Sequence, residues 1–430
     1  MEFYKESNFK TTKAGEIPSG WNIAALEDYC SQITDGSHFS PNEDKNGDYK
    51  IATVANIKND KIDLNSCKKI SKDEYEKLTH NGCRPNKGDI LFSKDGTVGL
   101  SFSYKQGVDI VLLSSIAIIR PKKELYSDYG AYILKLEKVF QQIVGSKRGT
   151  GLSRIILKDL RKVKIPIPNK IEEQRQIASI LSRVDDTIQK TDEIIQKTQL
   201  LKKALMQELL TKGIGHKEFK YSKELGCEIP KEWNDVEIGD SKYSTLLTGG
   251  TPSTKKKEYW NGTVPWMASG DIHMKYIKEV PGRITQLGLK NSAAKYIPVN
   301  SVLVALNGQG KTKGTVAINQ IELTCNQSIA AYVLNKEEFD PFFILHYLTS
   351  KYVELRSLAS NNDRAGLNLR LLRGITVPKP PLSEQRQIAS ILSRVDDQIE
   401  KERQTKEQLE RLKKGLMQIL LTGKVRVKVN

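Results

Sequence analysis

One polar and apolar pattern occurs twice in this chain without a single change. The segment EQRQIASILSRVDD fills Glu173–Asp186 and fills Glu384–Asp397 again. A match of this length between two segments does not arise by chance, so the chain carries an internal duplication. Any fold for the chain must therefore contain two copies of one structural unit in tandem.

The duplication extends beyond the identical segment in a weaker form. Glu16-Ile17-Pro18 with Trp21 returns as Glu228-Ile229-Pro230 with Trp233. Further matching segments are Leu201-Lys202-Lys203 with Leu412-Lys413-Lys414, Ser115-Ile116-Ala117 with Ser328-Ile329-Ala330, and Gly96-Thr97-Val98 with Gly314-Thr315-Val316. The order along the chain is therefore globule, helix, globule, helix.

Apolar residues in both identical segments have the spacing of a helix that buries one face. Ile177, Leu181, Val184 and Ile188 recur at intervals of four or three residues, and the second copy repeats them. The expected helices cover 169–213 and 381–423, with Asn169 and Ser383 as N-caps and with Gly213 and Gly423 at the ends. A helix of about 40 residues is about 60 Å long and requires another helix beside it.

The connectivity predicts that the two long helices run antiparallel. The first helix leads from the first globule to the second, whereas the second helix starts at the second globule and must run back to lie along its twin. The result is a pseudo-two-fold coiled coil whose carboxyl terminus returns near residue 1. The alternative is two globules with independent helical stalks.

The remaining segments, 1–168 and 214–380, are expected to be globular domains of the α/β class, followed by a tail over 424–430. Asp89–Phe92 and Val108–Leu113 predict strands, and Tyr129–Val144 predicts a helix. Connections rich in Asn, Gly and Lys favour loops that take part in recognition.

The charge of the chain points to a polyanionic partner. It has 68 Lys and Arg against 51 Asp and Glu, a formal net charge of +17. Such an excess favours nucleic acid, and membrane surfaces attract basic proteins in the same way. The first residues lack the apolar core of a signal peptide and no apolar run is long enough to cross a bilayer, which predicts a cytoplasmic protein without membrane contact. The five widely spaced cysteines predict reduced thiols.

One segment loosely matches a phosphate-binding loop. Ala305–Thr312, ALNGQGKT, has the glycines and the lysine of that motif. A phosphate-binding loop opens a helix, whereas the following Gly314–Ile318 is rich in β-forming residues, which favours a loop between strands. The histidines have no metal-ligand spacing, and no methyl-transfer or nuclease motif occurs, so we expect no catalytic site, cofactor or metal in this chain. The alternatives are an ATPase or nuclease, and a helical scaffold that never contacts DNA.

Basic and amide side chains gather in loops at corresponding places in the two halves, as in Ser146–Gly151 and Asn361–Gly366. Arg and Lys contact phosphates or guanine, and Asn and Gln pair with adenine, although a merely solvated loop has the same composition. The candidate DNA-binding residues are Lys94, Lys147, Arg148, Arg154, Asn307, Gln309, Lys311, Lys313, Asn361, Asn362, Arg364, Asn368 and Arg370.

Several segments together resemble the specificity subunits of type I restriction-modification systems. IPIPNKIEEQRQIASILSRVDDTI and VPKPPLSEQRQIASILSRVDDQI are similar to the two conserved regions of that family, in which a proline-rich lead-in enters a long helix. EIPSGWN and EIPKEWN resemble the openings of its two target-recognition domains. Thr248–Ser253 and Val264–Met267 resemble a stretch within such domains. The resemblance covers nearly the whole chain.

The resemblance implies a non-catalytic subunit that binds double-stranded DNA. Each recognition domain is expected to read one half of an asymmetric bipartite site, with an unread spacer set by the paired helices. The implied partners are two methyltransferase subunits, which bind S-adenosylmethionine and flip out adenine, and restriction motor-nuclease subunits that need ATP and Mg. Thr34–His38 departs from Thr248–Pro252 at the corresponding place, so a recognition code shared by the two halves is not implied.

The identity of polar positions in the repeat leads to one more expectation. Helix packing requires only the apolar positions to match, yet the Gln, Arg and Ser positions are identical as well. Identical surfaces suit two identical partner subunits, and divergent globules suit two different half-sites. Recent exchange that copied one helix onto the other is an alternative origin, and it is compatible with such a function.

Overall fold

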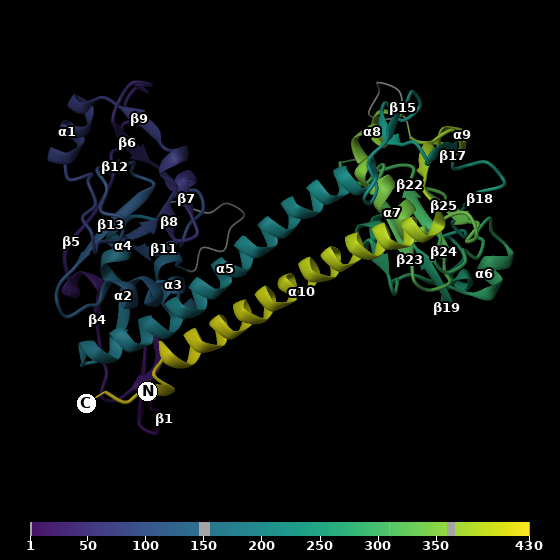
Figure 1. Ribbon diagram of the computed structural model, residues 1–430. Coiled ribbons are helices and arrows are strands. Elements are labelled where there is room, and N and C mark those ends of the chain that lie inside the picture. Colours follow the sequence, from purple (N-terminus) through teal and green to yellow (C-terminus); the bar gives the residue numbers. More distant parts are fainter. Residues whose placement is uncertain (1, 146–154, 309, 359–365, 430) are drawn as a thin grey trace. The chain divides into compact units, whose positions relative to one another are not determined.

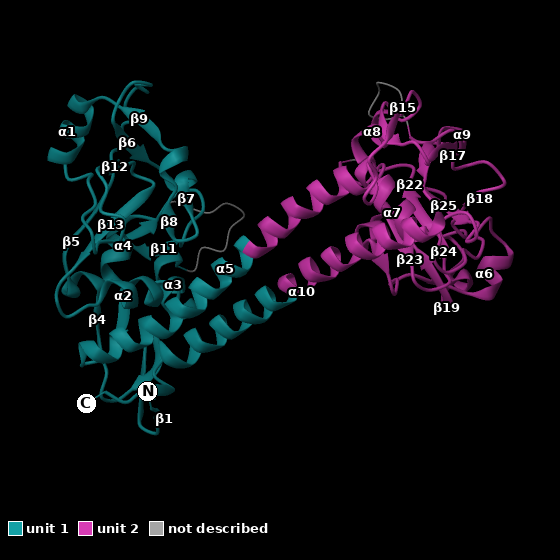
Figure 2. Cartoon of the chain, viewed as in Figure 1, with its two compact units in different colours: residues 1–193, 404–430 teal, residues 194–403 magenta. Residues whose placement is uncertain are grey.

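The computed structural model describes residues 2–145, 155–308, 310–358 and 366–429. The chain divides into two compact units (Figure 2). Unit 1 comprises residues 1–193 and 404–430, and unit 2 comprises residues 194–403. Each unit therefore contains one globule, the first part of one long helix and the last part of the other.

Two helices of 39 residues carry the repeated segment, α5 (Ile171–Leu209) and α10 (Leu382–Leu420). Gly213 and Gly423 follow them with φ angles of 68° and 69°, the left-handed conformation that commonly ends a helix. The expected N-caps are wrong. Ser383 is already helical because Pro381 O accepts the N–H of Gln385 at 3.0 Å, and Asn169 lies outside the first turn of α5.

The two helices run antiparallel in each unit (Figure 1). In unit 1, Asp185 of α5 pairs with Lys413 of α10 at 2.5 Å, and Asp192 pairs with Lys406 at 2.8 Å. Two turns forward along α5 thus correspond to two turns back along α10. In unit 2, Lys202 of α5 pairs with Asp396 of α10. These two residues are the counterparts of Lys413 and Asp185, so the same ion pair recurs with the two helices exchanged. The antiparallel prediction is confirmed, and the alternative of independent stalks is wrong.

The two globules contain sheets with the same strand order. In unit 1 the main sheet has the order β5-β13-β10-β11, and in unit 2 it has the order β18-β25-β22-β23 with β20 added at the edge. A second sheet, β9-β6-β12 or β21-β19-β24, contains one parallel pair in each unit, β6 with β12 and β19 with β24. The structure therefore supplies the strand order that the sequence leaves open.

The strands of unit 1 are β1 (Phe3–Lys5), β2 (Phe9–Thr12), β3 (Gly15–Pro18), β4 (Asn22–Ala25), β5 (Cys30–Asp35), β6 (Tyr49–Ala52), β7 (Ile57–Lys58), β8 (Lys61–Ile62), β9 (Lys68–Ile70), β10 (Ile90–Ser93), β11 (Ser101–Ser103), β12 (Ile110–Leu112), β13 (Ile116–Pro121), β14 (Lys164–Ile167) and β27 (Val425–Val427). The strands of unit 2 are β15 (Phe219–Ser222), β16 (Cys227–Pro230), β17 (Asn234–Glu237), β18 (Ser244–Thr248), β19 (Trp260–Met267), β20 (Tyr276–Ile277), β21 (Arg283–Ile284), β22 (Val302–Ala305), β23 (Val316–Asn319), β24 (Thr324–Cys325), β25 (Ile329–Leu334) and β26 (Thr376–Lys379). The shorter helices are α1 (Lys72–His80), α2 (Ser127–Ile133), α3 (Glu137–Val144), α4 (Leu157–Lys162), α6 (Gln286–Lys290), α7 (Pro341–Ser350), α8 (Tyr352–Leu358) and α9 (Leu369–Arg373).

The central strand of each globule is buried on both faces. Ile90 and Phe92 of β10 lie in one core cluster, and Leu91 between them lies in another. This alternation follows from the two-residue period of a strand. The strands expected over 89–92 and 108–113 are confirmed as β10 and the shorter β12.

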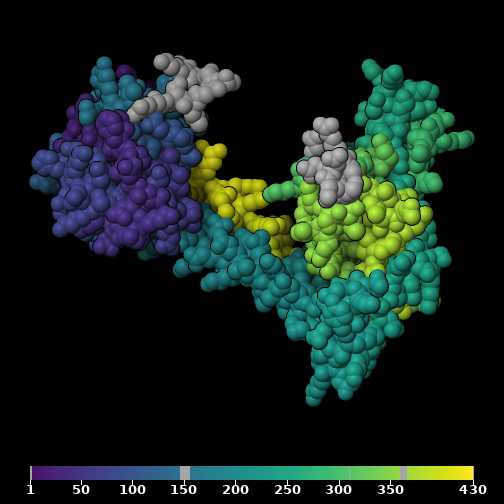
Figure 3. Space-filling view, turned by 90° about the horizontal axis from the view of Figure 1, so that it is seen from above, coloured from purple at the N-terminus to yellow at the C-terminus, as the bar shows by residue number. Residues whose placement is uncertain are grey.

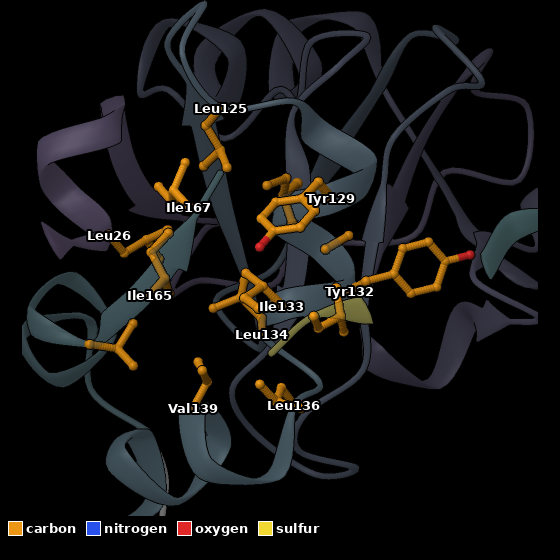
Figure 4. Packing of buried hydrophobic residues seen from close by; sticks show 14 of the residues in the cluster. Leu26, Leu125, Tyr129, Tyr132, Ile133, Leu134, Leu136, Val139, Ile165 and Ile167 are labelled. Atoms are coloured by element: carbon orange, nitrogen blue, oxygen red, sulfur yellow. The ribbon is translucent and has the colours of Figure 1, made fainter. Parts of the chain in front are cut away.

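The single helix expected over 129–144 is wrong, because the chain breaks between α2 and α3. Leu134 and Leu136 in the break and Val139 in α3 all lie in the same core (Figure 4). In an uninterrupted helix Leu136 and Val139 would share a face, and Leu134 would point to the opposite side. The break therefore lets both helices bury apolar side chains in the core that also contains residues of β14 and α5.

The two chain ends meet within unit 1. Strand β1 pairs antiparallel with β27, with Phe3 opposite Val427 and Lys5 opposite Val425. The expected return of the carboxyl terminus to the neighbourhood of residue 1 is confirmed. All five cysteines are free thiols. Across the described residues, no helix combines the length and the apolar character that a membrane span requires.

Candidate nucleic-acid interface

Each globule has a glycine-containing turn between the third and fourth strands of its main sheet. The turn joins β10 to β11 in unit 1 and β22 to β23 in unit 2. Gly99 N donates to Ser93 O at 3.0 Å, and Gly314 N donates to Ala305 O at 2.9 Å. Gly99 is therefore the structural counterpart of Gly314, and the sequence match of Gly96 with Gly314 is wrong by a few positions. We call the described residues of these turns the hairpin loops, which are 94–100 in unit 1 and 306–308 with 310–315 in unit 2.

In each unit a second segment reaches the hairpin loop at the same point. Ile155 N donates to Lys94 O at 3.0 Å, and Leu367 N donates to Leu306 O at 2.8 Å. Gly366 also lies directly against the amide of Asn307. Ile155, which follows the first basic loop in the sequence, and Gly366, which ends the second, thus lie beside the hairpin loops. The candidates that lie outside the described residues are Lys147, Arg148, Arg154, Gln309, Asn361, Asn362 and Arg364.

Four described candidates in unit 2 are exposed, namely Asn307, Lys311, Asn368 and Arg370. Asn368 also has a structural role, because its side chain caps α9 by accepting a hydrogen bond from Leu371 N at 3.0 Å. Contact between these four residues and DNA remains a prediction.

Lys94 and Lys313 are buried rather than exposed. Lys94 occupies the position of the apolar Leu306 in the other globule, and only 3% of its side chain is exposed. Its Nζ lies 3.1 Å from Asp35 and 3.3 Å from Asp95, so the ammonium group is neutralised within the fold. In this arrangement the ammonium group of Lys94 faces carboxylates instead of solvent.

The segment Ala305–Thr312 lies in a loop between strands. It connects β22 to β23, which pair antiparallel with Val304 opposite Val316. A phosphate-binding loop requires a helix at this point, whose N-terminal amides hold the phosphate. The prediction of a strand-to-strand loop is therefore confirmed for the described residues.

Part of the polar identity in the repeat is explained by contacts within each unit. Gln174 and Gln385 are almost fully buried. Gln174 accepts a hydrogen bond from Tyr126 N at 2.8 Å, and Gln385 accepts one from Asp340 N at 2.9 Å. These positions are identical because each amide fastens its helix to its own globule. Only the identical positions that remain exposed are available to a partner.

The exposed identical positions form what we call the duplicated helix surface. Its members are Arg175, Arg183, Asp186, Lys190, Leu412, Lys414 and Gln418 in unit 1, and Arg386, Arg394, Asp397, Lys401, Leu201, Lys203 and Gln207 in unit 2. Leu412 and Leu201 are 51% and 53% exposed, which is unusual for two leucines at equivalent positions. The side chains of α5, teal in Figure 3, lie open at the surface in that view. Exposed, equivalent apolar and charged groups are typical of a protein-protein contact.

A buried ionic cluster fastens the helices of unit 2 to the globule. Asp396 accepts hydrogen bonds from Lys275 Nζ at 2.5 Å and from Tyr276 Oη at 2.8 Å, in addition to its ion pair with Lys202. Burial alone would raise the pKa of Asp396, but the two ammonium groups lower it to about 2. Burial and the nearby Lys275 charge lower the pKa of His346 to about 3, so this imidazole is neutral at pH 7. In unit 1, Asp185 instead accepts a hydrogen bond from Tyr132.

Sequence reasoning missed the residues that support the hairpin loop of unit 2. Arg356 and Tyr352 in α8 bind its backbone, with Tyr352 Oη donating to Lys311 O at 2.8 Å. Their distance from the loop along the chain leaves no local signal in the sequence.

These features define a duplicated protein with two divergent globules and one repeated helix surface. Residues 18–199 and 230–411 each match the model of the type I restriction modification DNA specificity domain. The chain therefore belongs to the family of type I restriction-modification specificity subunits, which are DNA-recognition and not catalytic components.

Two relatives cover the whole chain. The putative type I restriction enzyme MjaX specificity subunit of Methanocaldococcus jannaschii is 34% identical over 100% of this chain and 99% of that protein. The MjaVIII specificity subunit of the same organism is 30% identical over 100% of this chain and 98% of its own length. The crystal structure of a type I restriction-modification S subunit from M. genitalium has the same fold, with a TM-score of 0.61 and 15% identity over 95% of this chain and 97% of that one.

Proposed function

We propose that each globule of this chain reads one half of a bipartite site in double-stranded DNA. The supporting observation is that the globules share a strand order but differ in their hairpin loops. Loops held by a common framework are the usual carriers of recognition, because they change without disturbing the sheet. The excess of Lys and Arg, 68 against 51 Asp and Glu, suits the phosphate contacts that such reading requires.

We further propose that two methyltransferase subunits dock on the duplicated helix surface, one on each unit. These partners would bring S-adenosylmethionine, and restriction subunits would bring the ATP- and Mg-dependent motor and nuclease. The chain itself then contributes the choice of DNA site. Identity at the exposed positions supports this docking, since buried identical positions such as Gln174 are explained by contacts within the fold.

Exchange of one globule tests the proposal. Residues 228–377 would be replaced by the corresponding segment of another family member, and the methylated DNA sequences would be mapped in cells that also express the methyltransferase. Only one half of the methylated site should change, because the first globule is untouched. A change in both halves would show that the globules do not read independently.

A further inference from the structure

The hairpin loop of unit 2 is fastened by two side chains of α8. Arg356 Nη1 donates to Gly310 O at 2.8 Å and to Lys313 O at 3.2 Å. Tyr352 Oη donates to Lys311 O at 2.8 Å, and the Arg356 guanidinium lies 5.5 Å from the centre of the Tyr352 ring. Three backbone carbonyls of one loop are thus bound by a single pair of stacked side chains.

The loop needs such support because its own sequence restricts its backbone conformation little. Gly308, Gly310 and Gly314 have φ angles of 131°, 69° and 80°, in a region that other residues rarely adopt. Glycine also loses the most conformational entropy on ordering, so the loop gains less from local preference than an ordinary turn does. Contacts from outside the loop must therefore select its conformation.

The equivalent helix of unit 1 supports the equivalent glycine with a different side chain. A Cβ placed on Gly99 would lie 2.7 Å from the ring of Phe140 in α3, and one placed on Gly314 would lie 3.1 Å from Cγ of Arg356. The two globules thus keep the same construction, a helix side chain packed on a left-handed glycine. They differ in whether that side chain packs as an aromatic ring or binds carbonyls.

We propose that Arg356, with Tyr352, and Phe140 are positioning residues that determine the conformation of the DNA-reading loop in their own globule, and thereby part of its half-site preference. This inference rests on the proposed function. Arg356 acts through the loop, because its Nη1 donates to the backbone oxygens of Gly310 and Lys313.

The test measures half-site preference and salt dependence in the complex with the methyltransferase. We expect Arg356→Gln to weaken binding to the cognate site about tenfold, the usual consequence of losing hydrogen bonds that a charged group donates. Methylation mapping should show relaxed choice in the second half-site alone. Tyr352→Phe, which removes one hydroxyl, should change the same half-site to a smaller extent, and Phe140→Leu should affect the first half-site alone.

Salt dependence separates positioning from direct contact. A lost phosphate contact lowers the slope of log affinity against log salt by about 0.9, whereas a positioning residue leaves it unchanged. Arg356→Gln should therefore keep the wild-type slope and the wild-type affinity for non-specific DNA. A slope lowered by about one would overturn the inference in favour of direct contact, and so would unchanged half-site preference in all three variants.

Two controls keep loss of folding and failure of the proposed function distinguishable. Arg411→Gln makes the same change of charge at a side chain that is 81% exposed in unit 1, and it should leave both half-sites unchanged. Thermal unfolding of Arg356→Gln should stay within about 2 °C of wild type, and a larger fall with loss of both half-sites would contradict positioning. Failure of the globule exchange described above would overturn the proposed function itself.

Discussion

Glu173 and Glu384 open the two identical segments, yet they bind different partners. Glu173 accepts hydrogen bonds from Arg426 Nε and Nη2 at 2.9 and 2.8 Å. Glu384 accepts one from Trp233 Nε1 at 3.0 Å and lies 2.9 Å from His216 Nε2. Arg426 follows the end of α10, and His216 follows the end of α5. In each unit, a residue beyond the end of one long helix thus binds the glutamate near the start of the other, and the side chain that does so differs between the units.

The difference explains an unpaired group in unit 1. Trp21 is the counterpart of Trp233, and its buried Nε1 finds no hydrogen-bond partner among the described residues. Arg426 lies 5.9 Å from the centre of the Trp21 ring and binds both oxygens of Glu173. The arginine has thus taken the carboxylate that accepts the indole N–H in unit 2, and a cation-π contact replaces that hydrogen bond.

Removal of Arg426 should destabilise unit 1. Glu173 is only 1% exposed, so Arg426→Met leaves a buried carboxylate without its cation, at a cost of about 3 kcal/mol in the free energy of unfolding. The double variant Glu173→Gln with Arg426→Met should recover most of that loss, because no buried charge remains. Urea unfolding of the three proteins measures both effects. Lys428→Met, which removes an exposed ion pair with Glu2, should cause no measurable change in the free energy of unfolding. An equal loss of stability in that variant would contradict the stabilising role of the pair between Arg426 and Glu173.

At the scale of elements, the sequence predicted what depends on local periodicity and on the repeat. The long helices and their antiparallel direction follow from apolar spacing and connectivity. The order of the strands does not, because β10 pairs with β13 and β11 through contacts that no local pattern encodes. The prediction of Ser383 as an N-cap was wrong because the helix begins directly after a proline, two positions earlier. Helix boundaries commonly differ by one or two positions in this way.

The candidate site was predictable to a similar degree. Loops rich in basic and amide residues were recognised, and the structure places Ile155, beyond the first of these loops, and Gly366, at the end of the second, beside the hairpin loops. The burial of Lys94 was not predictable, since its partner Asp35 is distant in the chain and the alignment with Leu306 appears only in the sheet. The supports Arg356 and Tyr352 were missed for the same reason, because tertiary packing alone brings α8 to the loop.

The proposed docking on the duplicated helix surface can be tested by reversing charges on it. Arg183→Glu and Arg394→Glu reverse the charge at equivalent exposed positions, so each single variant should lose one of two bound methyltransferase subunits. The double variant should bind neither, with at least tenfold weaker association at each unit. Native mass spectrometry of the purified complexes counts the subunits. Arg403→Glu is the matched control, because position 192 of the other copy holds Asp. Two retained subunits in the double variant would show that docking occurs elsewhere.

At the scale of the whole molecule, unit 1 is built from two separate stretches of the chain, and unit 2 is the continuous stretch between them in the sequence. Unit 1 needs residues 404–430, and unit 2 needs residues 194–403 with the end of α5 and the start of α10. The ion pairs Asp185 with Lys413 and Lys202 with Asp396 hold the two helices in one register on either side of the boundary. A change of helix length must therefore be made in both helices together if each unit is to keep its own pairing.

Deletion of seven residues from each helix is such a change. Removing Thr191–Lys197 and Glu402–Gln408 takes out the segments around the boundary between the units and leaves the ion pairs of Asp185 and Asp396 in register. Each helix becomes about 10 Å shorter, at 1.5 Å per residue. If the helices determine the separation of the two readings, the unread spacer should shorten by up to about three base pairs, at about 3.4 Å each.

Both half-site sequences should survive this deletion, because neither globule changes. Methylation mapping with the methyltransferase reports the half-sites and the spacer in the same experiment. A matched deletion of Thr191–Lys197 from α5 alone shifts the register of one helix against the other. It should therefore disrupt the pairing of the helices in one unit and abolish methylation. An active double deletion with an unchanged spacer would show that the separation is determined by the partner subunits, because the helices would then have been shortened without consequence for the distance between the readings.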